Sequence, residues 1–335
     1  MRILLSLAVG LLLGVAAPAT ASAATLYVAP SGSGSACSSS SPCSSWDVAL
    51  DKAAPGDHVQ MAAGTYPSQT LTRDSTNLAP VVFEPAEGVD RVTVGTLVLR
   101  ADYVTVRGVD ASYLLPCSGS GGSCNPSVKN AVTGVTVEDF RSRGGMYGHG
   151  LDHVTFRNGE MGPQTDGSDL VQIGMGFPSR DVTFDRMYFH DNYPLGDFAA
   201  TPHTDCIQAF GIDHFTISNS RFERCTNDDF LASTDSGAQW SNLTLVNNWF
   251  GKVFRCDSGH CRTVNELQQG YLSVYIGSNL TQGNNRIEGN YFEQALHQHA
   301  QAWAGTSTTL IRGNIGINDG CVANATFEAN RWGTG

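Results

Sequence analysis

Three acidic stretches near the middle of the chain combine residue types and spacing that suit acid–base chemistry. They are Asp169–Ile173, His203–Gln208 and Asn227–Leu231, and in each an aspartate comes shortly before an apolar run. If the stretches occupy equivalent places in successive layers of a stacked structure, Asp205 lies roughly 5–8 Å from one member of the pair Asp228–Asp229. These side chains then form one candidate site.

Three roles are open to carboxylates at this separation. They can divide general acid and general base work on a glycosidic bond, with their spacing deciding between inversion and retention. They can hold Ca²⁺, for which Asp169 and Asp205 are the candidate ligands, and the ion would bridge to an acidic sugar. They can also be hydrogen-bonded turn residues without chemistry. Because an unpaired buried carboxylate is costly, we expect Asp205 at a corner with its carboxylate turned outward.

A repeated eight-residue pattern supplies the framework that would stack these aspartates. It reads apolar, Thr, apolar, then Asn or Gly, and several copies end in an inward-pointing aromatic residue, as in Val182–Phe189 (VTFDRMYF). Alternation places Thr on the face opposite to its apolar neighbours, and Asn or Gly accepts the tight backbone of a corner. The nine copies begin at Val104, Val135, Val154, Val182, Phe215, Leu243, Asn285, Thr309 and Ala325.

The repeat predicts an all-β fold, a right-handed parallel β-helix, which is a single-stranded solenoid. A β-sandwich would not repeat the same residue types at the same places in each unit. The first rung would otherwise expose apolar side chains and an open strand edge. The segment Trp46–Ala54, which is followed by Pro55 and Gly56, predicts an N-terminal capping helix over this rung. We therefore expect a strand and capping helix in residues 24–60 and the β-helix in residues 61–335, truncated at its C-terminus.

Three short stretches at the start of the chain resemble known proteins. Leu26–Gly32 (LYVAPSG), Ala53–Asp57 (AAPGD) and Ala63–Tyr66 (AGTY) are similar to the beginning of right-handed β-helix proteins of the pectin-lyase-like superfamily. The resemblance spans nearly all of the mature chain and implies an extracellular polysaccharide as the partner. This superfamily contains lyases, hydrolases, epimerases and non-catalytic adhesins, so the fold does not fix the reaction.

The order of four motifs also resembles the polygalacturonase family, whose motifs are Asn-Thr-Asp, Asp-Asp, Gly-His-Gly and Arg-Ile-Lys. The resemblance implies that Asp228 or Asp229 is the acid, Asp205 its base partner, His260 an orienting group and Arg286 a clamp for a substrate carboxylate. His203 and Gln208, beside Asp205, are further candidates for binding substrate. The match is partial, since His203 replaces Asn, Cys261 the second Gly and Glu288 the Lys, and His260 comes about ten residues late.

A lyase needs other groups. It requires a base for the proton next to a uronate carboxylate, and Ca²⁺, Arg or Lys to neutralise that carboxylate. Lys252, Arg255 and Arg262 form a basic cluster near the acidic stretches, and we take Lys252 and Arg255 as candidate substrate-binding residues. Aromatic residues such as Tyr275 can stack on sugars, although each is individually more typical of the core.

The cysteines and the N-terminus indicate export. Arg2, the apolar run Ile3–Ala17 and the small residues Ala21–Ala23 predict a signal peptide in residues 1–23. Cysteines of an exported chain predict disulfides. The expected pairs are Cys37 with Cys43, Cys117 with Cys124, Cys206 with Cys225, and Cys256 with Cys261, and Cys321 is left for a partner beyond Gly335.

The net charge and the length of the apolar run limit the classes of binding partner. The formal net charge of −11 argues against nucleic acid, and the apolar run is too short to favour a membrane span. We expect a secreted monomer that cleaves an acidic or pectin-like polysaccharide in a groove on the helix face. The alternative is a non-catalytic β-helix that binds glycans or cell surfaces. No cofactor is required, and Ca²⁺ stays a candidate.

Overall fold

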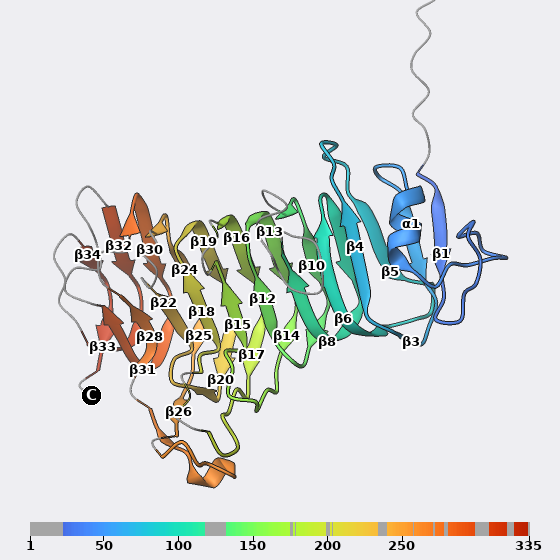
Figure 1. The fold of residues 1–335 in the computed structure, drawn as a ribbon. Coiled ribbons are helices and arrows are strands. Elements are labelled where there is room, and N and C mark those ends of the chain that lie inside the picture. Colours follow the sequence, from blue (N-terminus) through green and yellow to red (C-terminus); the bar gives the residue numbers. More distant parts are fainter. Residues whose placement is uncertain are drawn as a thin grey trace, which may run out of the picture.

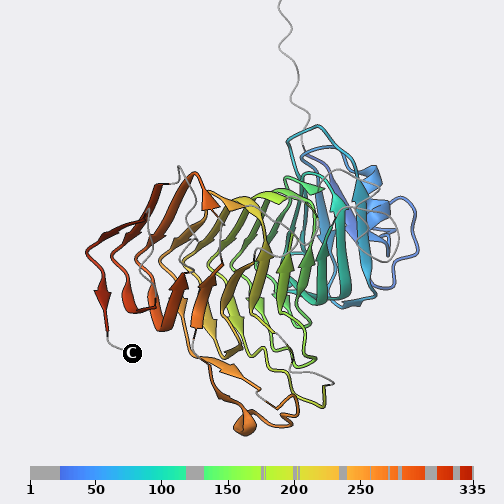
Figure 2. The same ribbon diagram turned by 60° about the vertical axis from the view of Figure 1, so that its left-hand side comes forward.

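The chain winds into an elongated stack of parallel strands with a short α-helix at its N-terminal end (Figure 1). The computed structural model describes residues 23–117, 132–174, 177, 179–198, 202, 204–233, 240–256, 258–270, 272–277, 281–298, 308–319 and 325–333. His203, Cys124 and Cys321 lie outside these residues. In the turned view, successive turns of the chain again lie side by side along the axis (Figure 2).

One sheet, here called face one, runs the length of the stack, and its neighbouring strands are parallel. Its strands in spatial order are β1 (Thr25–Val28), β2 (His58–Met61), β5 (Val81–Pro85), β7 (Val104–Arg107), β10 (Thr136–Glu138), β13 (Leu151–Arg157), β16 (Ser179–Asp185), β19 (Ile212–Ser218), β24 (Thr244–Val246), β30 (Asn284–Glu288), β32 (Thr308–Arg312) and β34 (Ala325–Glu328). The short strands β9 (Val132–Thr133), β23 (Trp240–Ser241) and β29 (Thr281–Gln282) pair beside it.

The other strands form faces two and three, which share four long strands. These are β6 (Val92–Ala101), β8 (Val109–Pro116), β31 (Tyr291–Gln298) and β33 (Ile315–Asp319), and each pairs with different neighbours in its two halves. Face two adds β3 (Thr65–Tyr66), β11 (Arg141–Ser142), β14 (Glu160–Met161), β17 (Tyr188–His190), β20 (Arg221–Glu223), β25 (Trp249–Phe250) and β35 (Arg331–Trp332). Face three adds β4 (Gln69–Arg73), β12 (Met146–Gly148), β15 (Val171–Ile173), β18 (Ile207–Phe210), β22 (Phe230–Ser233) and β28 (Leu272–Ile276).

The predicted repeat is confirmed by the strand register. Its second position forms one ladder, in which Thr105, Thr136, Thr155, Thr183, Thr216 and Thr244 are consecutive partners. The fifth position has positive φ in every copy, for example 62° at Gly108, 51° at Asn158 and 53° at Ala329. This conformation turns the chain from face one into face two, as the Asn and Gly residues predicted.

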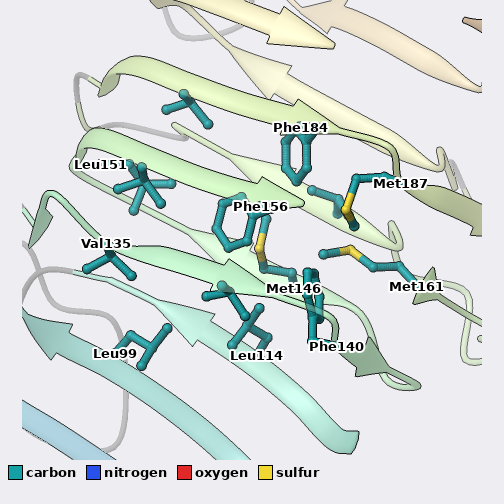
Figure 3. Close-up of a cluster of buried hydrophobic side chains, with 14 of the residues drawn as sticks. Leu99, Leu114, Val135, Phe140, Met146, Leu151, Phe156, Met161, Phe184 and Met187 are labelled. Carbon is teal, nitrogen blue, oxygen red and sulfur yellow. The ribbon is translucent and has the colours of Figure 1, made fainter. Parts of the chain in front are cut away.

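The core lies between the three faces and consists of stacked apolar side chains (Figure 3). The inward aromatic position is also confirmed. Phe189, Phe222, Phe250 and Phe292 form a continuous stack with ring centroids 4.7, 4.9 and 5.2 Å apart. Such offset stacking stabilises a core beyond the burial of area alone.

A buried asparagine ladder holds the corner between faces one and two. The side-chain oxygen of Asn290 accepts from the Asn248 amide at 2.9 Å, and its Nδ2 donates to the Leu245 carbonyl at 2.9 Å. Asn314 and Asn330 continue the pattern. These side chains satisfy backbone groups that the turn leaves without a sheet partner.

The predicted helix is present as α1 (Trp46–Lys52), ending two residues before the predicted limit at Ala54. The Ser45 side chain accepts from the Val48 amide and starts it. Trp46 is fully buried and stacks on Phe83 with ring centroids 5.8 Å apart. The helix thus covers apolar side chains at the N-terminal end of the stack.

Three predicted disulfides are present, Cys37–Cys43, Cys206–Cys225 and Cys256–Cys261. Cys117 is also disulfide-bonded, and its expected partner Cys124 lies outside the described residues. Within those residues no helix has the length and apolar character needed to cross a membrane.

Candidate functional site

The three acidic stretches meet at the corner where the chain passes from face two into face three. The register pairs Val171 with Ile207 and Ile207 with Phe230, so the aspartates two residues before each are equivalent. Contacts confirm this, because Oδ1 of Asp169 accepts from the Asp205 amide at 2.8 Å and Oδ1 of Asp205 accepts from the Asp228 amide at 3.1 Å. We call Asp169, Asp205 and Asp228 the acidic ladder.

The expected outward position of the Asp205 carboxylate is wrong. Its side chain has no exposed surface, and Oδ1 also accepts from Nδ2 of Asn227 at 2.8 Å. Nδ2 of Asn192 donates to the Asp205 carbonyl at 2.8 Å. Burial is tolerated because backbone and amide N–H groups replace the lost water. Asp169 and Asp205 therefore hold the next rung in place, which is the turn role that the sequence left open.

Asp229 is separated from the ladder by its burial. Its side chain has no exposed surface, and its amide donates to the Ser273 carbonyl at 2.9 Å. Burial raises the pKa of this carboxyl well above its ordinary value, and the charges of Asp228 and Glu293 add to the rise, while the Gly251 amide opposes it. Burial therefore favours the neutral form of Asp229, which has no access to solvent.

The acidic ladder does not fit Ca²⁺ as its side chains are placed. One oxygen each of Asp169 and Asp205 is bound to the next backbone amide, and the other oxygen of Asp169 accepts from Nε2 of Gln172 at 3.2 Å. Ca²⁺ requires six to eight converging oxygens. Among the described residues, three metal-ligating groups come together at Asp152, His153 and Asp181 instead.

His260 belongs to a separate excursion of the chain. It follows β26 (Val253–Arg255) in a loop that the Cys256–Cys261 disulfide closes and that returns through η2 (Val264–Glu266) and β27 (Gln268–Gln269). Its ring is 63% exposed, and Nδ1 lies 3.3 Å from Oδ1 of Asp197. The described contacts of His260 do not include the acidic ladder.

Arg286 is on the wrong sheet to serve the acidic ladder. It lies in β30 of face one, directly after Thr244 in the Thr ladder, and its Nε contacts Oε1 of Glu288 at 2.6 Å. The acidic ladder lies where face three begins. The polygalacturonase-like series of motifs is therefore not assembled in one place, and a clamp role for Arg286 beside Asp205 is not supported by the register.

Arg255 lies one rung from Asn227, which precedes Asp228 in the chain. Phe254 pairs with Thr226, and the Asn227 amide donates to the Phe254 carbonyl at 2.6 Å, so Arg255 stands in the rung after Asn227. Lys252 is close by in the chain, with Nζ 3.7 Å from Oε1 of Glu293.

A stripe of aromatic and amide side chains, interrupted by Leu231, runs along face three beside the acidic ladder, and Gln208 and Leu231 within it keep only 9% and 7% of their surface exposed. Its members, joined by the register, are Tyr147, Gln172, Gln208, Leu231, Tyr275 and His297. Tyr113 stacks on Tyr147 with centroids 5.9 Å apart, and Tyr275 stacks on His297 at 5.2 Å. Nε2 of Gln172 donates to Oε1 of Gln208 at 3.4 Å.

The sequence analysis missed Tyr113 and Tyr147. Burial raises the pKa of both hydroxyls, and the charge of Asp169 adds to the rise at Tyr147, so both phenols stay neutral. The signal that could have found them is their place in the rung. Tyr147 stands immediately after an inward Met146, as Gln172 follows Val171 and Gln208 follows Ile207.

Comparison with known proteins supports the architecture alone. No family model matches the chain, and no curated protein matches its sequence. The chain is a parallel β-helix. Its fold is similar to pectate lyase Pel9A, with 15% identity, 92% of this chain and 80% of that chain covered, and a TM-score of 0.46. It is also similar to an alginate lyase from Paenibacillus sp. str. FPU-7, with 14% identity, 92% and 99% covered, and a TM-score of 0.40.

A third similar structure is the GH136 lacto-N-biosidase from Eubacterium ramulus, with 9% identity, 92% of this chain and 68% of that chain covered, and a TM-score of 0.38. The predicted parallel β-helix fold is confirmed by the strand pairing itself. The reaction has to be argued from this chain's own residues.

Proposed function

We propose that this protein is exported and cleaves a uronate-containing polysaccharide bound along the outside of face three. The observation that carries the proposal is the stripe of stacking and hydrogen-bonding side chains on face three, which runs beside Asp228, with Arg255 in the rung after Asn227. The disulfides support export, because such bonds persist in oxidising surroundings.

The stripe suits an extended sugar chain. Tyr147 and Tyr275 are four rungs apart through Gln172, Gln208 and Leu231, which corresponds to about 19 Å at a rung spacing of about 4.8 Å. The tyrosine faces offer apolar surface to pyranose rings. Between them, the amides of Gln172 and Gln208 can donate and accept hydrogen bonds with sugar hydroxyls.

The charged groups favour elimination over hydrolysis. Asp228 and Asp169 each keep 6% of their surface exposed, whereas Asp205 and Asp229 keep none, so neither Asp205 nor Asp229 offers Asp228 an exposed carboxylate partner for hydrolysis. A guanidinium binds a sugar carboxylate in a planar, bidentate manner. With Arg255 neutralising the uronate, the proton next to its carboxylate becomes more acidic, and we assign Asp228 as the group that accepts it. The electron pair left behind forms the C=C bond, the glycosidic C–O bond breaks, and the leaving oxygen takes a proton from water.

Glycan binding without cleavage is the second candidate. It is favoured by the structural use of Asp169 and Asp205, whose oxygens cap backbone amides. The stripe on face three would bind the same polymer whether or not Asp228 transfers a proton.

The test uses polygalacturonate, alginate and a neutral glycan as substrates for the mature protein. Ultraviolet absorbance of an unsaturated uronate product is expected from an acidic polymer, and Asp228→Asn or Arg255→Gln should abolish it. Arg262→Gln is the matched control, because Arg262 is 73% exposed on the same excursion and pairs with Asp197. New reducing ends without this absorbance would indicate hydrolysis, and binding without any product would leave the non-catalytic function.

A further inference from the structure

A histidine–aspartate ladder lies on face one, near the start of strands β13, β16 and β19. His153, Asp181 and His214 each have left-handed backbone, with φ of 54°, 51° and 57°. Their neighbours Asp152, Arg180 and Asp213 are consecutive partners, so the three residues occupy the same place in successive rungs. A shared backbone conformation projects their side chains in the same direction at a spacing of about 4.8 Å.

The carboxylate of Asp181 lies between the two imidazoles. Its Oδ2 is 3.3 Å from Nε2 of His153, and its Oδ1 is 3.9 Å from Nδ1 of His214. Among the described residues these two imidazoles contact the Asp181 carboxylate, and the charge of the neighbouring Arg180 also acts on it.

A second layer of carboxylates orients the rings. Oδ1 of Asp152 contacts Nδ1 of His153 at 2.5 Å, and Arg180 holds Asp152 through two bonds of 2.7 Å. Oδ1 of Asp213 contacts Nδ1 of His214 at 3.0 Å. A carboxylate on Nδ1 fixes the ring so that the Nε2 lone pair of His153 faces Asp181, as in the carboxylate–histidine–metal arrangement of many metal sites.

We propose that His153, Asp181 and His214 bind a divalent transition metal ion, with Zn²⁺ as the best match. Two imidazoles and one carboxylate form a donor set that zinc accepts, whereas Ca²⁺ prefers oxygen. Metal–ligand bonds of about 2.0–2.1 Å in a tetrahedron put neighbouring ligand atoms about 3.3–3.4 Å apart. The 3.3 Å between His153 and Asp181 already matches. Nδ1 of His214 is held by Asp213 at 3.0 Å, so its 57% exposed ring has to turn to present Nε2 to the ion.

The charge and exposure of the site agree with a cation. The carboxylates of Asp152, Asp181 and Asp213 all act on the guanidinium of Arg180, so among these four described residues the negative charges outnumber the positive one. His153 is 60% exposed and Asp181 35%, so an ion and one or more completing waters can reach the ligands.

The test is calorimetric titration of the chelator-treated mature protein with Zn²⁺. One ion should bind per chain, and His153→Ala and Asp181→Asn should each weaken binding by at least roughly 10- to 100-fold. His214→Ala should weaken it as well. His58→Ala is the matched control, since His58 is also an exposed histidine on face one and contacts Glu84 at 2.7 Å, and it should leave the affinity unchanged.

Thermal melts and circular dichroism of each variant without metal distinguish loss of ligand from loss of fold, and Zn²⁺ should raise the melting temperature of the wild type but not of Asp181→Asn. Failure to saturate with millimolar Zn²⁺ would overturn the proposal. Binding that survives in both His153→Ala and Asp181→Asn, or that His58→Ala removes equally, would overturn it too. Calcium should give no comparable heat.

Discussion

Asp205→Ala should mainly destabilise the fold, because the Asp205 carboxylate serves the next rung. The change removes the acceptor for the Asp228 amide at 3.1 Å and for Nδ2 of Asn227 at 2.8 Å. Leaving the buried Asp228 amide without a partner costs about 1–3 kcal/mol. Nδ2 of Asn227 is part-buried and also contacts Oδ2 of Asp228 at 3.4 Å, so its lost bond adds about 0.5–1.5 kcal/mol, and the total is about 1.5–4.5 kcal/mol. Asp205→Asn keeps one side-chain oxygen but loses the charge, and about 1.5–3 kcal/mol is expected.

The assay is urea unfolding followed by circular dichroism and tryptophan fluorescence, with activity on an acidic polysaccharide measured in parallel under conditions where each variant is folded. The order of stability should be wild type, Asp205→Asn, Asp205→Ala, and the folded Asn variant should keep most of its activity. Asp228→Asn should show the reverse behaviour, with near-normal stability and lost activity. Wild-type stability of Asp205→Ala together with complete loss of activity would refute the structural role of Asp205.

Further predictions concern the buried carboxyl of Asp229, the asparagine ladder at the corner between faces one and two, and the stripe on face three. Asp229→Asn should stabilise the protein more at pH 8 than at pH 4. The pKa of the Asp229 carboxyl is raised in the folded state, so the stability of the wild type falls as the pH rises above the pKa of this carboxyl in the unfolded chain. Melting curves with unchanged pH dependence would contradict this. Asn290→Ala should lower the free energy of unfolding by about 1–3 kcal/mol for each buried backbone group that it leaves unpaired. Urea unfolding measures this change. An unchanged free energy of unfolding would argue against a stabilising role of the asparagine ladder. Tyr147→Ala should weaken polysaccharide binding in affinity electrophoresis by about fivefold, equivalent to about 1 kcal/mol. Trp249→Ala, which changes an exposed aromatic residue on face two, should leave the binding unchanged. Equal effects of the two variants would place the glycan elsewhere.

The repeat predicted most of the fold because two local rules act together in each copy. Alternation decides which side chains face the core, and the corner position requires positive φ, which Gly108 and Asn158 accept readily. When both rules repeat along the chain, the stacking register follows. The Thr ladder and the stack from Phe189 to Phe292 are therefore readable from the sequence.

The candidate site was only partly predictable. The alignment of Asp169, Asp205 and Asp228 follows from the register, but burial depends on which amide each carboxylate meets, and no local pattern encodes that. Arg286 shows a different failure. It occupies the Thr position of its own repeat copy, which already predicts that its side chain lies on the outer surface of face one. The order of the motifs along the chain gave no sign of this position.

The position of a bound acidic oligosaccharide tests the central claim most directly. A crystal structure of Asp228→Asn soaked with an oligouronate should show sugars along Tyr147, Gln208 and Tyr275 of face three. One sugar carboxylate should lie within ion-pair distance of Arg255. An oligosaccharide bound instead beside Arg286 on face one, from a polymer that the wild type cleaves, would contradict the account.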